Sequence, residues 1–77
     1  GTAEVDYLYV FGQYVLPLEV KSGKIGRLKS IMQFLAEYQS PVGLRVSQLP
    51  LRKEGNILSI PLYLLGELDR LLQEVLV

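Results

Sequence analysis

Four charged residues near the start of the chain have the types and spacing that metal-dependent chemistry needs. Glu4 and Asp6 belong to one largely apolar run and Glu19 and Lys21 to the next, with Gly12-Gln13 between the two runs. Glycine readily adopts the positive φ required at the first position of a two-residue hairpin turn. The sequence therefore predicts two strands joined by a tight turn at Gly12-Gln13.

This turn fixes which residues face each other across the hairpin. Paired residue numbers add up to 25, so Asp6 faces Glu19 and Glu4 faces Lys21. Because side chains alternate along a strand, all four project from one face. A three-residue turn, or a bulge at Pro17, would shift this register and separate the cluster. The opposite, packing face receives three apolar pairs: Val5-Val20, Tyr7-Leu18 and Tyr9-Leu16.

Opposed carboxylates in a sheet destabilise it unless a cation lies between them. Lys21 is one candidate for that cation, and a hard divalent metal such as Mg²⁺ or Mn²⁺ is the other. Two interpretations therefore stay open: a metal site built on Asp6 and Glu19, or an exposed sheet face with weak surface ion pairs.

The composition removes several kinds of chemistry. The 77 residues include no cysteine and no histidine, which excludes disulfides, cysteine nucleophiles, zinc–thiolate sites and histidine-based triads. Eight basic residues balance eight acidic ones, so no global charge favours nucleic acid. Hydrophobic residues make up 49% of the chain, which suggests apolar surface that meets a partner. No signal peptide or membrane span is apparent, and we expect a cytoplasmic protein.

Hydrophobic periodicity predicts an α/β domain of four strands and two helices. The expected elements are strands at 2–12 and 13–21, a helix at 27–39, a strand at 42–47, a polar loop at 48–56, a strand at 57–60 and a helix at 62–76. A right-handed crossover makes the strand at 42–47 parallel to the second strand. Apolar residues surround the helix at 62–76 on nearly all sides, so one side packs on the sheet and another points to a partner.

Three basic residues flank the start of the helix at 27–39: Lys24, Arg27 and Lys29. Cations there oppose the helix dipole, and a docked anion would relieve this, a phosphate backbone being the natural candidate. The alternative is a solvated basic face.

Three segments carry a resemblance to a known family. They are Glu4-Val-Asp-Tyr7, Glu19-Val-Lys-Ser-Gly-Lys24 and Ile57-Leu-Ser-Ile-Pro-Leu-Tyr-Leu64. In this order they resemble the PD-(D/E)XK nuclease-like domain at the C-terminus of many bacterial and archaeal AAA-type ATPases. The resemblance implies a restriction-endonuclease-like mixed sheet in the order β-β-α-β-β-α. The chain lacks the helix that often precedes the first strand in this family, so the domain would be truncated at its N-terminus.

The resemblance also implies roles for individual residues. Asp6 and Glu19 would hold Mg²⁺ or Mn²⁺ with the Val20 carbonyl as a further ligand, while Lys21 would orient or deprotonate the attacking water. Glu4 would tune Lys21 or support the metal through water. Phosphates of DNA would be contacted by the basic residues Lys24, Arg27 and Lys29.

The same fold without catalysis is the alternative. In either case we expect residues 1–77 to be a single nuclease-like domain, the C-terminal fragment of a larger ATPase-containing protein. Without catalysis it would be an interaction or dimerisation module. It would dock to the upstream ATPase domain, or form a homodimer, through its C-terminal helix.

Overall fold

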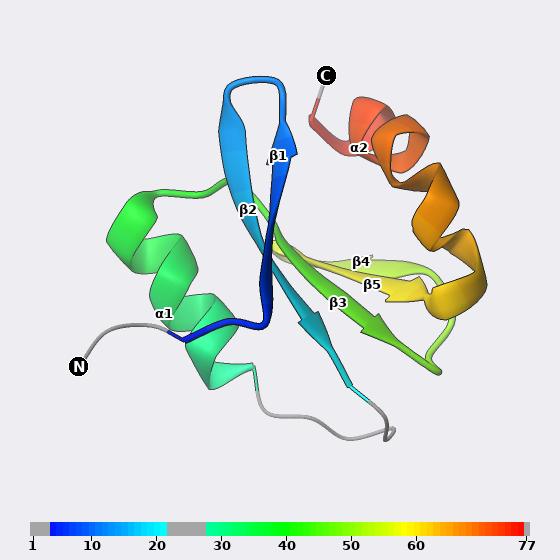
Figure 1. Ribbon diagram of the computed structural model, residues 1–77, viewed down its shortest axis with the longest axis horizontal. Coiled ribbons are helices and arrows are strands. Elements are labelled where there is room, and N and C mark those ends of the chain that lie inside the picture. Colours follow the sequence, from blue (N-terminus) through cyan, green and yellow to red (C-terminus); the bar gives the residue numbers. More distant parts are fainter. Residues whose placement is uncertain (1–3, 22–27, 77) are drawn as a thin grey trace.

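A five-stranded mixed sheet with one helix packed on each face forms the body of the protein (Figure 1). The computed structural model describes residues 4–21 and 28–76. Its elements are β1 (Tyr7–Phe11), β2 (Tyr14–Val20), α1 (Lys29–Tyr38), β3 (Gly43–Ser47), β4 (Arg52–Glu54), β5 (Ile57–Pro61), the 3₁₀ helix η1 (Leu62–Glu67) and α2 (Leu68–Leu76). The expected α/β class with a mixed sheet is confirmed.

The β1–β2 hairpin has the predicted turn and register. Gly12 takes a φ of 59°, whereas Gln13 does not take a positive φ, as expected for a two-residue turn with glycine first. Tyr7 pairs with Leu18, and the antiparallel ladder continues without a bulge to Phe11 and Tyr14. Residue numbers in these pairs add up to 25, so the register on which the candidate site depends is confirmed.

The strands lie in the order β1-β2-β3-β5-β4. β2, β3 and β5 are parallel, so the predicted crossover between the second strand and the strand at 42–47 is confirmed. The N–H of Lys21 donates to the Val46 carbonyl (2.8 Å), which shows that odd-numbered residues of β2 direct their N–H groups toward β3. Pro17 is one of these, and pairing with β3 begins one residue later, at Leu18. The missing N–H of Pro17 therefore breaks no bond of the β2–β3 ladder.

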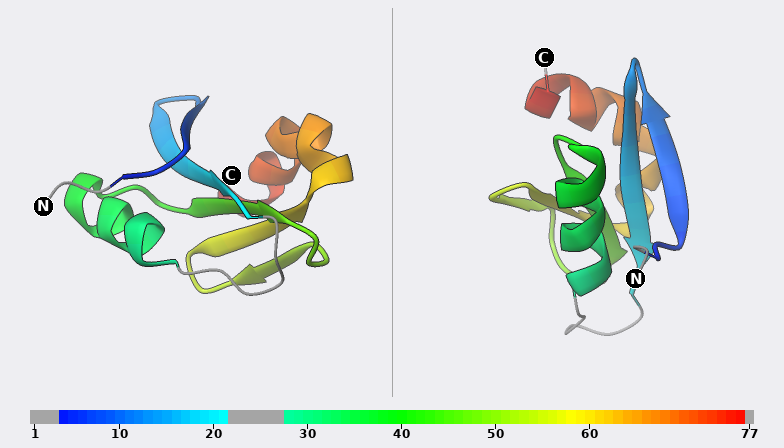
Figure 2. Two further views of the ribbon diagram at one scale, coloured as in Figure 1. Left: turned by 60° about the horizontal axis from the view of Figure 1, so that its bottom comes forward. Right: turned by 90° about the vertical axis from the view of Figure 1, so that its left-hand side faces the viewer.

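Apolar residues cover both faces of the sheet, and the two helices lie on opposite sides of it (Figure 2). Leu44, Val46, Leu58 and Ile60 face η1 and α2, where they join the larger core with Leu68, Leu71 and Leu72. On the other face, Ile57 packs with Ile31 and Leu35 of α1. All five residues of β3 are buried, because both of its faces are covered.

Three elements differ from the sequence prediction. The expected polar loop at 48–56 contains β4, which pairs with β5 in antiparallel fashion. The expected helix at 62–76 is divided into η1 and α2. The first strand begins at Tyr7, after a bend at Asp6, and the expected start at Thr2 lies outside the described residues. No described helix is long and apolar enough to cross a membrane.

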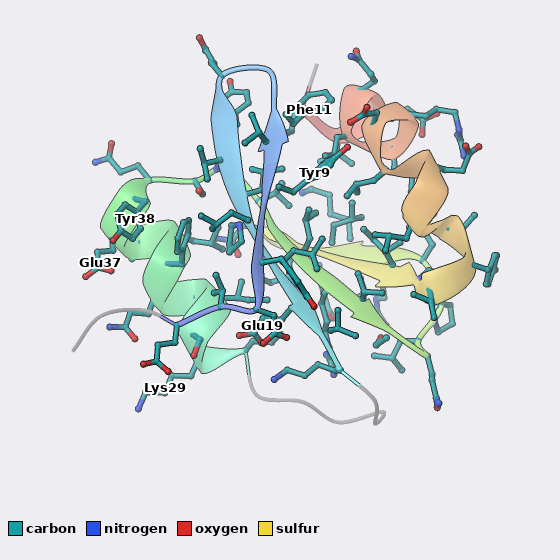
Figure 3. All side chains as sticks on the ribbon, in the orientation of Figure 1. Tyr9, Phe11, Glu19, Lys29, Glu37 and Tyr38 are labelled. Atoms are coloured by element: carbon teal, nitrogen blue, oxygen red, sulfur yellow. The ribbon has the colours of Figure 1, made fainter. Side chains whose placement is uncertain are left out.

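One polar contact ties the hairpin to α2. The Tyr9 hydroxyl donates a hydrogen bond to Asp69 Oδ1, and Figure 3 shows Tyr9 and Phe11 directed toward this helix. The hydrogen bond to Asp69, with burial and the Asp69 charge, raises the pKa of Tyr9 from 10.0 to about 12. Because Tyr9 holds its proton more tightly in the folded state, this interaction contributes its whole stabilisation of the fold at pH values below the unfolded pKa. This contribution is therefore lost as the pH rises from 10 to 12.

We expect Tyr9→Phe to lower the free energy of unfolding by about 0.5–1.5 kcal/mol near pH 8, the usual contribution of one hydrogen bond. The difference from the wild type should shrink above pH 10. Urea unfolding of both proteins at several pH values measures it. Tyr63→Phe is the control, since Tyr63 is 84% exposed. A Tyr9→Phe deficit that does not change with pH would contradict the assignment.

Candidate functional site

The Asp6 side chain contacts the end of β2. Its Oδ2 accepts a hydrogen bond from the Val20 N–H at 3.0 Å. The N–H and C=O of one strand residue point to the same edge, so the Val20 carbonyl also lies on the β1 side, near Asp6. The structure thus brings Asp6 beside Glu19-Val20-Lys21.

Glu19 and Lys21 form an ion pair at the same end of β2. Lys21 Nζ lies 3.2 Å from Glu19 Oε2, and the exposed fractions of the two side chains are 30% and 6%. The angles of this pair lie outside hydrogen-bond geometry. Glu19 Oε2 consequently accepts no hydrogen bond from residues 4–21 and 28–76, although it is buried. A buried carboxylate oxygen of this kind has capacity for a further cationic ligand.

Arg45 is a neighbour of this site that sequence reasoning missed. The parallel register places it directly beside Glu19, and Ser59 and Arg52 continue the same row across β5 and β4. Residues paired in register project from the same face, which here is the face that α1 covers. Arg45 is only 8% exposed. The available signal was a charged residue in the otherwise apolar segment 42–46. The sequence could not show that Glu19 is its neighbour, because that depends on the register between β2 and β3.

The predicted cluster of four charges on one face is only partly present. Val5 packs against the cluster of Ile31, Leu35 and Ile57, on the α1 side, and not on the face that receives Tyr9. The bend at Asp6 ends the strand alternation, so the prediction that Val5 and Tyr9 share a face was wrong. Glu4 is exposed, and its side chain makes no ion pair or hydrogen bond within the described part of the chain.

The three predicted phosphate contacts are only partly described. Lys24 and Arg27 lie outside the described residues. Lys29 is the first residue of α1 and is exposed (Figure 3). The helix that the sequence predicts from residue 27 is therefore described from Lys29 onward.

A cavity on the α1 side of the sheet adjoins the candidate site, and a larger one on the same side does not. A cavity of ≈ 240 Å³ is lined by Arg45, Arg52 and Ser59, the row that continues from Glu19, together with Glu54. Arg52 forms an ion pair with Glu54 at 3.1 Å. The larger cavity, ≈ 520 Å³, lies between the hairpin and the C-terminal part of α1 and contains neither Asp6 nor Glu19.

Metal ligands in this site are few. Among the described residues, no group of three or more acidic, histidine or cysteine side chains could hold a metal ion. The available donors are Asp6, Glu19 and the Val20 carbonyl, all oxygen atoms, which suit Mg²⁺ or Mn²⁺ completed by water. Comparisons of the chain with family models, curated proteins and solved structures found no match.

Proposed function

We propose that Asp6, Glu19 and the Val20 carbonyl bind Mg²⁺ or Mn²⁺ and that the site hydrolyses phosphodiester bonds of DNA. The observation that carries the proposal is the hydrogen bond from the Val20 N–H to Asp6 Oδ2. It joins an acidic residue before β1 to the acidic-apolar-lysine segment that ends β2. The oxygen donor set and the buried Oε2 of Glu19 are consistent with a hard divalent cation.

A bound cation would supply Lewis-acid stabilisation of the phosphate and lower the pKa of water. The protein groups have separate tasks. Asp6 and Glu19 supply the negative charge that holds the cation, and the Val20 N–H fixes the orientation of the Asp6 carboxylate. Lys21 forms an ion pair with Glu19, and its partly exposed ammonium group can hold a phosphate oxygen or position water.

Metal titration followed by backbone NMR tests the proposal directly. We expect Mg²⁺, up to about 10 mM, to produce saturable shifts of the amides around Asp6, Glu19 and Val20, and Mn²⁺ to broaden the same signals. Glu19→Gln should weaken metal binding by about tenfold or more, because it removes one of two ligating charges. Cleavage of branched and single-stranded DNA would then be measured with the wild type and with Glu19→Gln.

Glu67→Gln is a matched control, because Glu67 is exposed and pairs with Arg70 at 3.3 Å, away from β2. It should leave metal binding unchanged. If the wild-type amides do not shift at millimolar metal, or shift equally in both variants, the metal site is refuted.

A second function class has its own supporting observation. Lys21 Nζ lies 3.2 Å from Glu19 Oε2, so the two charges can balance each other as a purely structural ion pair. We infer from it a non-catalytic interaction module as the alternative function. In that case the docking surface would include Leu62 and Tyr63 of η1, which are 66% and 84% exposed, while Leu68, Leu71 and Leu72 of α2 face the sheet. Metal binding without DNA cleavage would favour neither function. The absence of both metal binding and DNA cleavage would favour the interaction module.

A further inference from the structure

The two edges of the sheet are built in opposite ways. β4 forms one edge and consists of three exposed charged residues, Arg52, Lys53 and Glu54. β1 forms the other edge with five residues, Tyr-Leu-Tyr-Val-Phe, and has no charge, no proline and no bulge. Proteins commonly protect an edge strand from pairing with other chains by shortening it, charging it or bending it. β4 is short and charged, whereas β1 has none of these protections within the described residues.

The outer edge of β1 presents hydrogen-bonding groups at alternate residues. Even-numbered residues of β2 direct their N–H groups toward β1, as the bond from Val20 to Asp6 shows. Their register partners Tyr7, Tyr9 and Phe11 therefore bond inward to β2, and Leu8 and Val10 direct their N–H and C=O groups outward. Figure 2, in its right-hand view, shows β1 at the margin of the molecule.

The side chains along this edge are also accessible. Tyr7, Leu8 and Val10 are 63%, 57% and 65% exposed, although all three are large apolar or aromatic residues. Val15, the register partner of Val10 on β2, adds to the same exposed surface. An apolar strand edge with unpaired backbone groups fits a partner that is itself an extended apolar strand.

We propose that β1 pairs with β1 of a second copy of this chain, forming a continuous ten-stranded sheet across a two-fold axis. The positions of the outward N–H and C=O groups, on Leu8 and Val10, allow this pairing. An antiparallel pairing centred on Tyr9 makes Leu8 and Val10 of opposite copies a hydrogen-bonded pair, twice by symmetry. In that register Tyr7 faces Phe11 of the second copy, and β1 itself contains no carboxylate, so no like charges oppose each other in the new ladder. The chain has no net charge to oppose association.

The predicted interface is short, so association should be weak, with a Kd on the order of 100 µM. Hydrogen exchange at single amides tests it without any substitution. As the protein concentration rises from about 10 µM to 1 mM, exchange at Leu8 and Val10 should slow by about fourfold, in proportion to the falling fraction of monomer. Exchange at Tyr9 should change little, because its N–H already bonds to β2. Sedimentation over the same range should show a monomer–dimer equilibrium.

Leu8→Lys and Val10→Lys should each abolish the dimer, because they place a charge on the edge, and both positions are exposed enough to tolerate lysine. Tyr63→Lys is the control, an equally charged change at an 84% exposed residue of η1, and it should not alter dimerisation. A monomer at all concentrations would overturn the proposal. So would a dimer in which exchange at Leu8 and Val10 is independent of concentration, since another surface would then hold it.

Discussion

Gly43→Ala is expected to lower the free energy of unfolding by about 3 kcal/mol, the upper end of the usual range for an overpacked core. A Cβ at Gly43 would lie 2.3 Å from Ile31 Cγ2 and 3.3 Å from Ile57 Cδ1. Ile31 is fully buried, so it cannot swing into solvent to make room. The φ of Gly43 is not positive, so the cost is steric and not conformational. The close approach of α1 to β3 thus depends on the missing side chain.

Thermal unfolding measures this effect, and a domain of this size should lose roughly 12–24 °C in Tm. Gly66→Ala is the matched control, because a Cβ there meets nothing within 4 Å. It should change stability by no more than about 0.5 kcal/mol. Ile31→Leu removes the γ2 methyl group and should recover part of the Gly43→Ala loss in the double variant. Equal effects of the two glycine substitutions would contradict the packing argument.

Local signals in the sequence predicted the hairpin that carries the candidate site. Gly12 sets the turn, the turn sets the register, and the register places Asp6 beside the end of β2. This succeeded because a two-residue turn leaves no freedom in pairing. The parallel placement of β3 followed from the handedness of the crossover through α1, which is likewise a general constraint.

The features that the sequence did not reveal are non-local. Arg45 lies beside Glu19 only because β3 pairs with β2 in one particular register, which no local pattern specifies. β4 was missed because Arg52, Lys53 and Glu54 show no alternation of apolar and polar residues, as suits an exposed edge. The side of the sheet on which Val5 packs depends on the bend at Asp6, which the strand pattern of the sequence conceals.

Lys21→Met is the second substitution with a large expected effect, about 2–3 kcal/mol of lost stability. It removes the ammonium group 3.2 Å from Glu19 Oε2 but keeps a side chain of similar length. Glu19 is 5% exposed, so its carboxylate would stay buried without the ammonium group that pairs with it. Loss of one partner from a buried pair typically costs about 3–5 kcal/mol. The partial exposure of Lys21 reduces that figure here.

A double-mutant cycle with Glu19→Gln isolates the interaction. Glu19→Gln alone should cost little, since the remaining lysine is partly exposed to water. The double variant should be more stable than Lys21→Met, because it no longer buries the Glu19 carboxylate without its lysine partner. We expect a coupling energy of about 2 kcal/mol from urea unfolding of the four proteins. Additive effects would show that the 3.2 Å pair does not contribute to stability.

The same cycle connects stability with the proposed metal site. In Lys21→Met a divalent cation is the natural replacement for the lost ammonium group, and at 100 times its Kd a ligand stabilises the folded state by about 2.7 kcal/mol. We therefore expect about 10 mM Mg²⁺ to restore much of the Tm of Lys21→Met and to leave the double variant unchanged. Rescue confined to the protein that retains Glu19 would identify this carboxylate as a metal ligand. If Mg²⁺ rescues neither, Glu19 serves only the ion pair, and the interaction module becomes the better account of the domain.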